Sequence, residues 1–135
     1  MIAAPKSLDF AGIVVVLTDY FDGLYLSDAD KLTQVFAPQA IYATVTEGTL
    51  KHYDMATYLP IVRARPSPAS RQEQRRDRIV SIEFAGPVTA VARVECAIGP
   101  LFFSDFLTLV HLDGRWQIIA KAFHFDTLPN LIGRN

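Results

Sequence analysis

The stretch LTLVHLDGRWQIIAKAFHF, residues 107–125, decides the fold because its two apolar runs are separated only by Asp113 and Gly114. An Asp-Gly pair between alternating apolar residues predicts a β-hairpin, since a type I′ turn needs positive φ at both central residues. A two-residue turn pairs His111 with Trp116. Side chains alternate along a strand, so this register assigns every hairpin residue to one of two faces.

The register predicts one nearly apolar face and one mixed face. The first face holds Asp105, Leu107, Leu109, His111, Trp116, Ile118, Ala120, Ala122 and His124. The second holds Ser104, Phe106, Thr108, Val110, Gln117, Ile119, Lys121 and Phe123. We expect the first face to lie under helices, because a nearly continuous apolar surface is stable only when it is covered.

The mixed face is itself too apolar to be an ordinary exposed surface. A large exposed apolar patch usually marks an interface, so we predict a homodimer through this face. Its expected contact residues are Val91, Phe106, Val110, Ile119 and Phe123. The alternative is a half-solvated sheet face with no partner.

The rest of the chain places helices first and strands later. We expect a helix from an N-cap at Ser7 to about Leu26, a short helix opened by Ser27, and a third capped by Asp54 that contains Pro60. A strand pair surrounds residue 48, and four more strands cover residues 78–85, 88–98, 101–112 and 115–125. This order predicts a single α+β domain over residues 1–135.

The charge and the apolar runs of the sequence limit which partners and which cellular location we expect. The formal net charge is −1, which argues against nucleic acid as a partner of the whole chain. The apolar run at residues 10–17 is too short to cross a membrane, which takes about 20 residues, and we expect a cytoplasmic protein with no membrane partner. The arginine-rich segment 63–78 has no interleaved aromatic residues, so we interpret it as a solvated loop rather than a phosphate-binding site.

Two longer stretches resemble a known superfamily. These are YFDGLYLSDADKLTQVFAPQAIY, residues 20–42, and FSDFLTLVHLDGRWQIIAKAF, residues 103–123. The chain is similar to the nuclear transport factor two-like superfamily, and within it to the SnoaL-like and putative lumazine-binding groups, over about residues 8–126. The resemblance implies a cone, in which a strongly curved, largely antiparallel (mixed) sheet wraps around three helices from the N-terminal half and leaves a pocket. This fold occurs in isomerases, cyclases and dehydratases and also in proteins without catalytic activity, so the fold alone does not identify the reaction.

Asp105 is the first candidate for catalysis. The register puts its carboxylate on the helix-covered face, where burial raises the pKa of a carboxyl group and suits it to proton transfer. His124 is predicted on the same face, at the mouth of the cone, as an acid–base partner. The alternatives are that Asp105 only fixes the core through a hydrogen bond and that His124 is a surface residue.

Four aromatic residues are candidates for binding a ligand: Tyr20, Tyr42, Tyr58 and Trp116. Tyrosine combines an apolar wall with a polar tip, which favours a small apolar or aromatic ligand. We expect no metal and no cofactor, because the three histidines have no metal-binding spacing and no glycine-rich phosphate loop is present.

Two functions remain open from the sequence. The first is a cofactor-independent isomerase, cyclase or dehydratase that acts on a cyclic or aromatic metabolite through carboxylate acid–base catalysis. The second is a non-catalytic domain that binds a ligand or serves as an accessory or dimeric scaffold.

Overall fold

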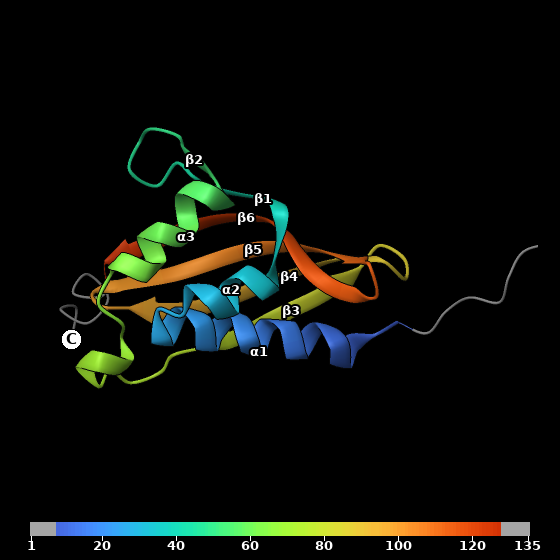
Figure 1. The fold of residues 1–135 in the computed structure, drawn as a ribbon, viewed down its shortest axis with the longest axis horizontal. Coiled ribbons are helices and arrows are strands. Elements are labelled where there is room, and N and C mark those ends of the chain that lie inside the picture. Colours follow the sequence, from blue (N-terminus) through green and yellow to red (C-terminus); the bar gives the residue numbers. More distant parts are fainter. Residues whose placement is uncertain (1–7, 128–135) are drawn as a thin grey trace, which may run out of the picture.

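The computed structural model describes residues 8–127 as helices packed on one face of a curled, unclosed sheet (Figure 1). The helices are α1 (Phe10–Leu26), α2 (Ala29–Val35), α3 (Met55–Ala64) and the short 3-10 helix η1 (Ala69–Arg71). The strands are β1 (Phe36–Thr44), β2 (Lys51–Asp54), β3 (Arg78–Phe84), β4 (Thr89–Ile98), β5 (Leu101–Leu112) and β6 (Arg115–Thr127). The predicted α+β class is confirmed.

The sheet is mixed and has the strand order β2-β1-β6-β5-β4-β3. Strands β1 and β6 are parallel, and every other neighbouring pair is antiparallel. The three consecutive strands β4, β5 and β6 are long, and they form the wall against which α1 packs (Figure 1). The core therefore lies between this wall and the helices.

Aspartates begin all three α-helices. Asp9 caps α1 by accepting a hydrogen bond from Gly12 N at 2.9 Å, and Asp54 caps α3 as predicted. The predicted cap Ser7 lies outside the described residues. Ser27 does not cap the second helix: it ends α1 with a φ of 49°, and the next residue, Asp28, provides the cap of α2. Asp28 caps α2 because its carboxylate accepts a hydrogen bond from the Lys31 N–H, which has no carbonyl partner within the helix.

The predicted hairpin turn is confirmed. Asp113 and Gly114 have φ angles of 53° and 81°, and His111 pairs with Trp116. These positive φ values explain why an Asp-Gly pair occupies the turn. In the neighbouring hairpin, a two-residue turn at Gly99 and Pro100 predicts by counting that Val94 lies opposite Asp105, and the two residues do pair.

Beyond the turn, a β-bulge changes the register of β6. Thr108 pairs with Ala120 and Leu109 with Ile118, so Ile119 is an extra residue on β6. One extra residue reverses the alternation of every side chain that follows it. The predicted faces of the strand after residue 119 are therefore wrong.

The corrected faces change which residues lie inside. Lys121 and Phe123 are buried against the helices, whereas Ala122 and His124 are exposed on the outer face. Phe123 thus does not belong to the outer patch assigned to a homodimer. Trp116 stays buried, because it precedes the bulge.

No helix within residues 8–127 has the length and apolar character needed to cross a membrane. The cytoplasmic location stays a prediction.

Candidate functional site

Asp105 lies in the middle of β5 and has an exposed fraction of 0%. Its Oδ2 accepts a hydrogen bond from the Tyr20 hydroxyl at 2.6 Å, whereas Oδ1 has no hydrogen-bond partner within residues 8–127. Burial raises the pKa of the Asp105 carboxyl, although the charge of Lys121 and the hydrogen bond from Tyr20 oppose this shift. Asp105 is therefore a buried carboxyl group with one oxygen still able to form a bond.

The bulge brings Lys121 into the cone beside Asp105. The Lys121 ammonium lies over the faces of several aromatic rings, at 4.9 Å from the ring centroid of Phe123 and 5.3 Å from that of Tyr20. Tyr42, Tyr58 and Phe103 complete this aromatic cage at 5.4, 5.6 and 5.9 Å. Such contacts stabilise a cation whose water has been removed.

The ionisation of Lys121 reflects opposing influences. Burial lowers the pKa of the Lys121 ammonium, but Tyr58, Asp105, Tyr42 and Cys96 together raise it, so that its pKa lies above the usual lysine value. No carboxylate in the described part of the chain forms a direct ion pair with Lys121. The interior thus contains an ammonium without a bonded counter-ion.

The three tyrosines predicted to line the cone do meet there. Tyr42 and Tyr58 stack with ring centroids 4.6 Å apart, and Tyr20 reaches the same cage from α1. The Tyr58 hydroxyl is buried and has no hydrogen-bond partner among the described residues. That these rings bind a ligand stays a prediction.

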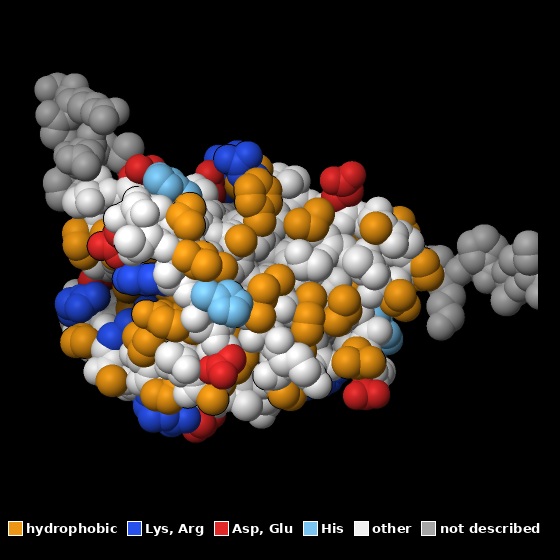
Figure 2. All heavy atoms as spheres, turned by 90° about the horizontal axis from the view of Figure 1, so that it is seen from above, with side chains coloured by type: hydrophobic (Ala, Val, Ile, Leu, Met, Phe, Trp, Pro, Cys, Tyr) orange, Lys and Arg blue, Asp and Glu red, His pale blue; other side chains and the backbone are white. Residues whose placement is uncertain are grey.

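Arg65 ends α3 and completes the group of polar side chains. Its Nε and Nη2 are buried without hydrogen-bond partners among the described residues, although the residue as a whole is partly exposed. The guanidinium lies close enough to Tyr42 for its charge, with that of Lys121, to oppose the rise that burial causes in the pKa of Tyr42. Seen from above, lysine and arginine side chains gather at the end of the molecule where α3 and η1 lie (Figure 2).

These side chains form what we call the interior polar cluster: Tyr20, Tyr42, Tyr58, Arg65, Asp105 and Lys121. Most buried polar groups in proteins have hydrogen-bond partners, and each one left unsatisfied costs about 1–3 kcal/mol. The cluster concentrates four such atoms: Tyr58 Oη, Asp105 Oδ1, and Nε and Nη2 of Arg65. A polar ligand bound among them would supply the missing partners.

The structure does not bring His124 to this cluster. His124 is exposed on the outer face, where its Nε2 lies 3.0 Å from Asp126 and its Nδ1 lies 3.2 Å from Thr46. The prediction that His124 shares a face with Asp105 is wrong, because the bulge at Ile119 turns it outward. His124 is therefore not a candidate for the acid–base partner of Asp105.

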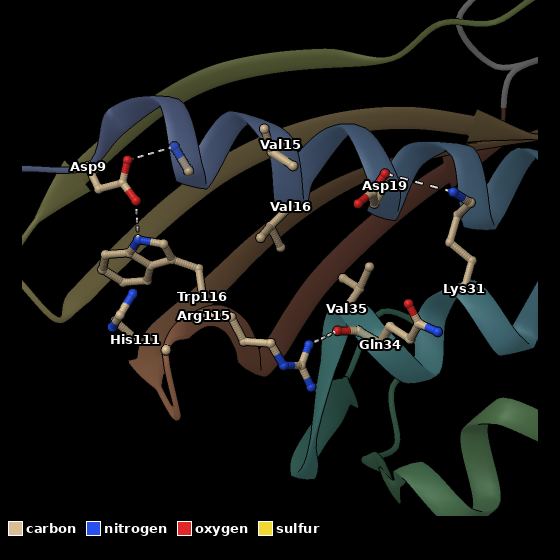
Figure 3. Close-up of a pocket in the computed structure, with 12 residues that line it drawn as sticks. Asp9, Val15, Val16, Asp19, Lys31, Gln34, Val35, His111, Arg115 and Trp116 are labelled. Atoms are coloured by element: carbon tan, nitrogen blue, oxygen red, sulfur yellow. Dashed lines mark hydrogen bonds and ion pairs between the residues drawn. The ribbon is translucent and has the colours of Figure 1, made fainter.

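Trp116 is buried but belongs to a different region. Its Nε1 donates a hydrogen bond to Asp9 at 3.2 Å, and its ring lies edge-on to His111 (Figure 3). The two residues line a groove of about 400 Å³ between α1, α2 and the β5–β6 turn. Trp116 is thus separated from the three tyrosines with which it was grouped.

The charged groups of this groove already have partners. Asp19 and Lys31 form an ion pair at 3.8 Å, and Arg115 donates to the backbone carbonyl of Gln34 (Figure 3). Asp9 accepts hydrogen bonds from Trp116 and from a backbone N–H. The interior polar cluster, in which four buried atoms lack partners among the described residues, is therefore the better candidate for a functional site.

Sequence reasoning missed Lys121 and Arg65. Trp116 and Phe123 are both large apolar residues, but their positions have opposite parity, so strict alternation cannot bury both. This conflict was the available signal for a bulge and for an inward Lys121. Arg65 gave no comparable signal, because an arginine at a helix end usually points into solvent.

Residues 8–127 contain no cluster of three or more histidine, cysteine, aspartate or glutamate side chains suited to a metal ion. Cys96 is buried in β4, and burial raises the pKa of its thiol, which disfavours the reactive thiolate.

A curled mixed sheet packed around helices is the NTF2-like fold, and several solved structures of this fold are similar to the present one. An NTF2-like protein of unknown function from Shewanella baltica OS155 is 23% identical, with a TM-score of 0.78 over 87% of this chain and 94% of its own. A similar protein from Methylobacillus flagellatus KT is 26% identical, with a TM-score of 0.76 over 88% and 93%. A ketosteroid isomerase-like protein from Erwinia carotovora atroseptica SCRI1043 is only 9% identical, with a TM-score of 0.70 over 90% and 99%, and shows the fold alone.

The family follows from the sequence match. The family model described as "Putative lumazine-binding" matches residues 8–124, and the chain belongs to this family. The predicted resemblance is confirmed.

A curated relative matches over a shorter stretch. In an alignment of length 40 that covers 28% of this chain, the sequence is 42% identical to the aldolase FrzH of a Cladobotryum species. The match spans about a third of that aldolase, 32% of its length.

Proposed function

We propose that this protein is a cofactor-independent enzyme that moves a proton on a small cyclic or aromatic carbonyl compound. The reaction class is that of isomerases, cyclases and dehydratases, in which a carbon next to a carbonyl loses a proton. Asp105 is the proton-transfer group. The observation that carries the proposal is its fully buried carboxylate, with Oδ2 held by Tyr20 and Oδ1 without a partner in the described part of the chain.

Asp105 has the properties that a general base needs. Removal from water raises the pKa of its carboxyl, and a base is most effective when its pKa approaches the working pH. The hydrogen bond from Tyr20 fixes the orientation of the carboxylate. Asp105 Oδ1 takes the proton, and the electron pair of the broken C–H bond forms a C=C bond while the carbonyl becomes an enolate.

Two neighbouring groups suit the enolate oxygen. The Lys121 ammonium supplies positive charge and the Tyr58 hydroxyl supplies a hydrogen-bond donor, both in an interior without bulk water. Electrostatic stabilisation of this kind is usually the largest contribution to such catalysis. Return of the proton to another carbon restores the carbonyl and completes an isomerisation. Enolate formation also begins aldol chemistry, which makes the partial similarity to an aldolase compatible with the proposal.

Exchange of carbon-bound protons in D₂O tests the proposal. A panel of cyclic ketones and β,γ-unsaturated ketones, followed by proton NMR, reports proton abstraction even when the natural substrate is not in the panel. We expect exchange faster than the buffer rate for at least one cyclic ketone. Binding of panel members without any enhanced exchange would instead support the second candidate, a ligand-binding module, which the Tyr20–Asp105 hydrogen bond favours because it occupies one carboxylate oxygen.

Tyr20→Phe is expected to move the acid side of the pH–rate profile to higher pH. A base acts when deprotonated, so the rate rises as the pH passes the pKa of Asp105. The hydrogen bond from Tyr20 lowers that pKa, and its loss raises it, by about one pH unit for a hydrogen bond to a charged group. The measurement is the exchange rate between pH 4 and 9.

Tyr25→Phe is the matched control, because the Tyr25 hydroxyl donates to the Glu73 carbonyl, outside the cluster. Its profile is expected to match that of the wild type. An unmoved profile in Tyr20→Phe, or a shift to lower pH, would contradict the assignment of Asp105 as the base.

We also propose that the protein is a homodimer through the outer face of the sheet. Phe106 lies in the middle of β5 on this face with an exposed fraction of 57%, beneath the guanidinium of Arg93. Next to it lies a depression of about 420 Å³ that extends to Ala122 and His124. Val91, Val110 and Ile119 are half-buried and add apolar surface. A second copy would cover this face by symmetry.

Phe106→Glu is expected to weaken this dimer at least about 30-fold, since a central aromatic anchor contributes 2 kcal/mol or more. Sedimentation velocity over a concentration series measures the change. Phe10→Glu is the control, because Phe10 has the same exposed fraction, 57%, but begins α1, on the helix-covered side of the sheet. Equal effects of the two substitutions, or a monomeric wild type at high concentration, would contradict the proposed interface.

A further inference from the structure

Arg65 differs from the arginines around it, because Arg76 is exposed to solvent and the others form ion pairs. Arg63, Arg71, Arg75 and Arg78 each form an ion pair with an acidic side chain, at distances between 2.6 and 3.6 Å. Arg65 has no such pair within residues 8–127, and yet Nε and Nη2 are the buried part of its guanidinium. A solvated arginine would not leave two N–H groups both removed from water and unbonded, because this costs free energy.

The two unbonded nitrogens lie on one edge of the guanidinium. Nε and Nη2 each direct an N–H bond in the same direction, with a spacing that matches the two oxygens of a carboxylate. This edge therefore forms both hydrogen bonds with a single planar oxyanion. A neutral carbonyl has only one oxygen for the two N–H groups and no negative charge to match the guanidinium.

The charges of the interior polar cluster point to the same ligand. Arg65 and Lys121 are cationic and Asp105 is the one carboxyl group of the cluster, so at least one positive charge is uncompensated whether or not Asp105 is ionised. The acids nearest to η1 are already engaged: Asp77 pairs with Arg75 at 2.6 Å, and Glu73 pairs with Arg71. A buried charge without a counter-ion is costly, and one ligand carboxylate would neutralise it.

The aromatic side chains supply the rest of the recognition. The rings of Tyr42 and Tyr58 stack at 4.6 Å, and Tyr53 continues the stack at 5.3 Å from Tyr42. Arg65 lies at the partly exposed end of the cluster, whereas Asp105 and Lys121 lie at its buried end. A ligand that reaches both ends has its acid group and its reacting carbonyl at opposite sides.

We propose that the ligand is a cyclic or aromatic carboxylic acid whose carboxylate binds Nε and Nη2 of Arg65. This assignment deepens the proposed function, since it rests on the same cluster and names the class of its substrate. Arg65 is a binding residue that positions the ring beside Asp105 and Lys121. It takes no part in the proton transfer.

Matched acid and amide probes test the proposal. Binding of 2-naphthoate and benzoate is compared with that of 2-naphthamide and benzamide, which have the same shape but no charge, by calorimetry and ligand-observed NMR. We expect at least one acid to bind wild-type protein at least about tenfold more tightly than its amide, as two charge-assisted hydrogen bonds imply. Equal affinities, or no binding by either acid, would overturn the proposal.

Variants assign the preference to one side chain. Arg65→Met is expected to weaken binding of the acid about tenfold or more and to leave binding of the amide within about twofold. Arg65→Lys keeps the charge but not the paired N–H groups, and should retain only part of the preference. Arg63→Met, which removes an exposed arginine of the same helix, should bind as the wild type does. An equal loss in Arg63→Met and Arg65→Met would overturn the proposal.

The outcome is separable from that of the proposed function. Arg65-dependent binding of acids without any proton exchange would leave this inference standing and remove the enzymatic proposal. Exchange that depends on Asp105 but is equally fast for neutral and acidic ketones would support the enzymatic proposal and remove the inference that Arg65 binds a carboxylate. Melting curves of the variants show whether each one is folded, and the Lys variant serves if the Met variant is not.

Discussion

Asp105→Asn is expected to lower the rate of proton exchange about 1,000-fold, within the 10²–10⁴ range that general acid–base catalysis contributes. Asparagine has nearly the same size and its carbonyl still accepts the hydrogen bond from the Tyr20 hydroxyl, but it cannot take a proton from carbon. The loss should therefore fall on the chemical step, with binding of cyclic ketones largely kept. Exchange rates and dissociation constants measured on the same protein sample separate the two effects.

A surface carboxylate provides the control for this substitution. Asp126 is exposed near the end of β6, beside His124, and Asp126→Asn should exchange protons at the wild-type rate. If the Asp105→Asn variant folded and exchanged protons as fast as the Asp126→Asn variant, Asp105 would not be the proton-transfer group. A melting curve for each variant establishes that the comparison concerns folded protein.

Phe123→Ala is expected to lower the free energy of unfolding by about 3–5 kcal/mol, as truncation of a buried phenylalanine does. The bulge at Ile119 turns Phe123 inward, where its ring packs against Tyr42 and Phe103 and its centroid lies 4.9 Å from the Lys121 ammonium. Urea denaturation measures the change.

His124→Ala is the matched control for this substitution. His124 follows Phe123 on β6 but is exposed on the outer face, so its truncation should change the free energy of unfolding by no more than about 0.5 kcal/mol. A loss in Phe123→Ala as small as that in His124→Ala would contradict the inward position of Phe123 after the bulge.

The sequence predicts the frame of the fold but not the details of its interior. Asp113 and Gly114 predict their turn because the requirement for positive φ is local to those two residues. The pairing of Asp105 with Val94 follows by counting from a second short turn. Counting fails beyond Ile119, since a bulge is favoured by the packing of both sides of the sheet and not by the residue itself.

The candidate site was predicted only in part for the same reason. Asp105 and the tyrosines at 20, 42 and 58 lie together, because they precede the bulge or come from elements whose inward faces are apolar. Lys121 was assigned to the opposite face, and Arg65 was assigned to a solvated segment. Both are long cationic side chains, and the burial of such a side chain is decided by tertiary contacts that no local pattern encodes.

A crystal structure of the protein soaked with 2-naphthoate or with an exchanging cyclic ketone tests the central claim most directly. The claim is that the unpartnered groups inside the cone exist to hold a small molecule. We expect the compound inside the cone, within hydrogen-bond distance of Asp105 Oδ1 or the Lys121 ammonium and against the rings of Tyr42 and Tyr58. A compound that occupied only the groove beside Trp116, or only the outer face around Phe106, with the cone unchanged, would contradict it.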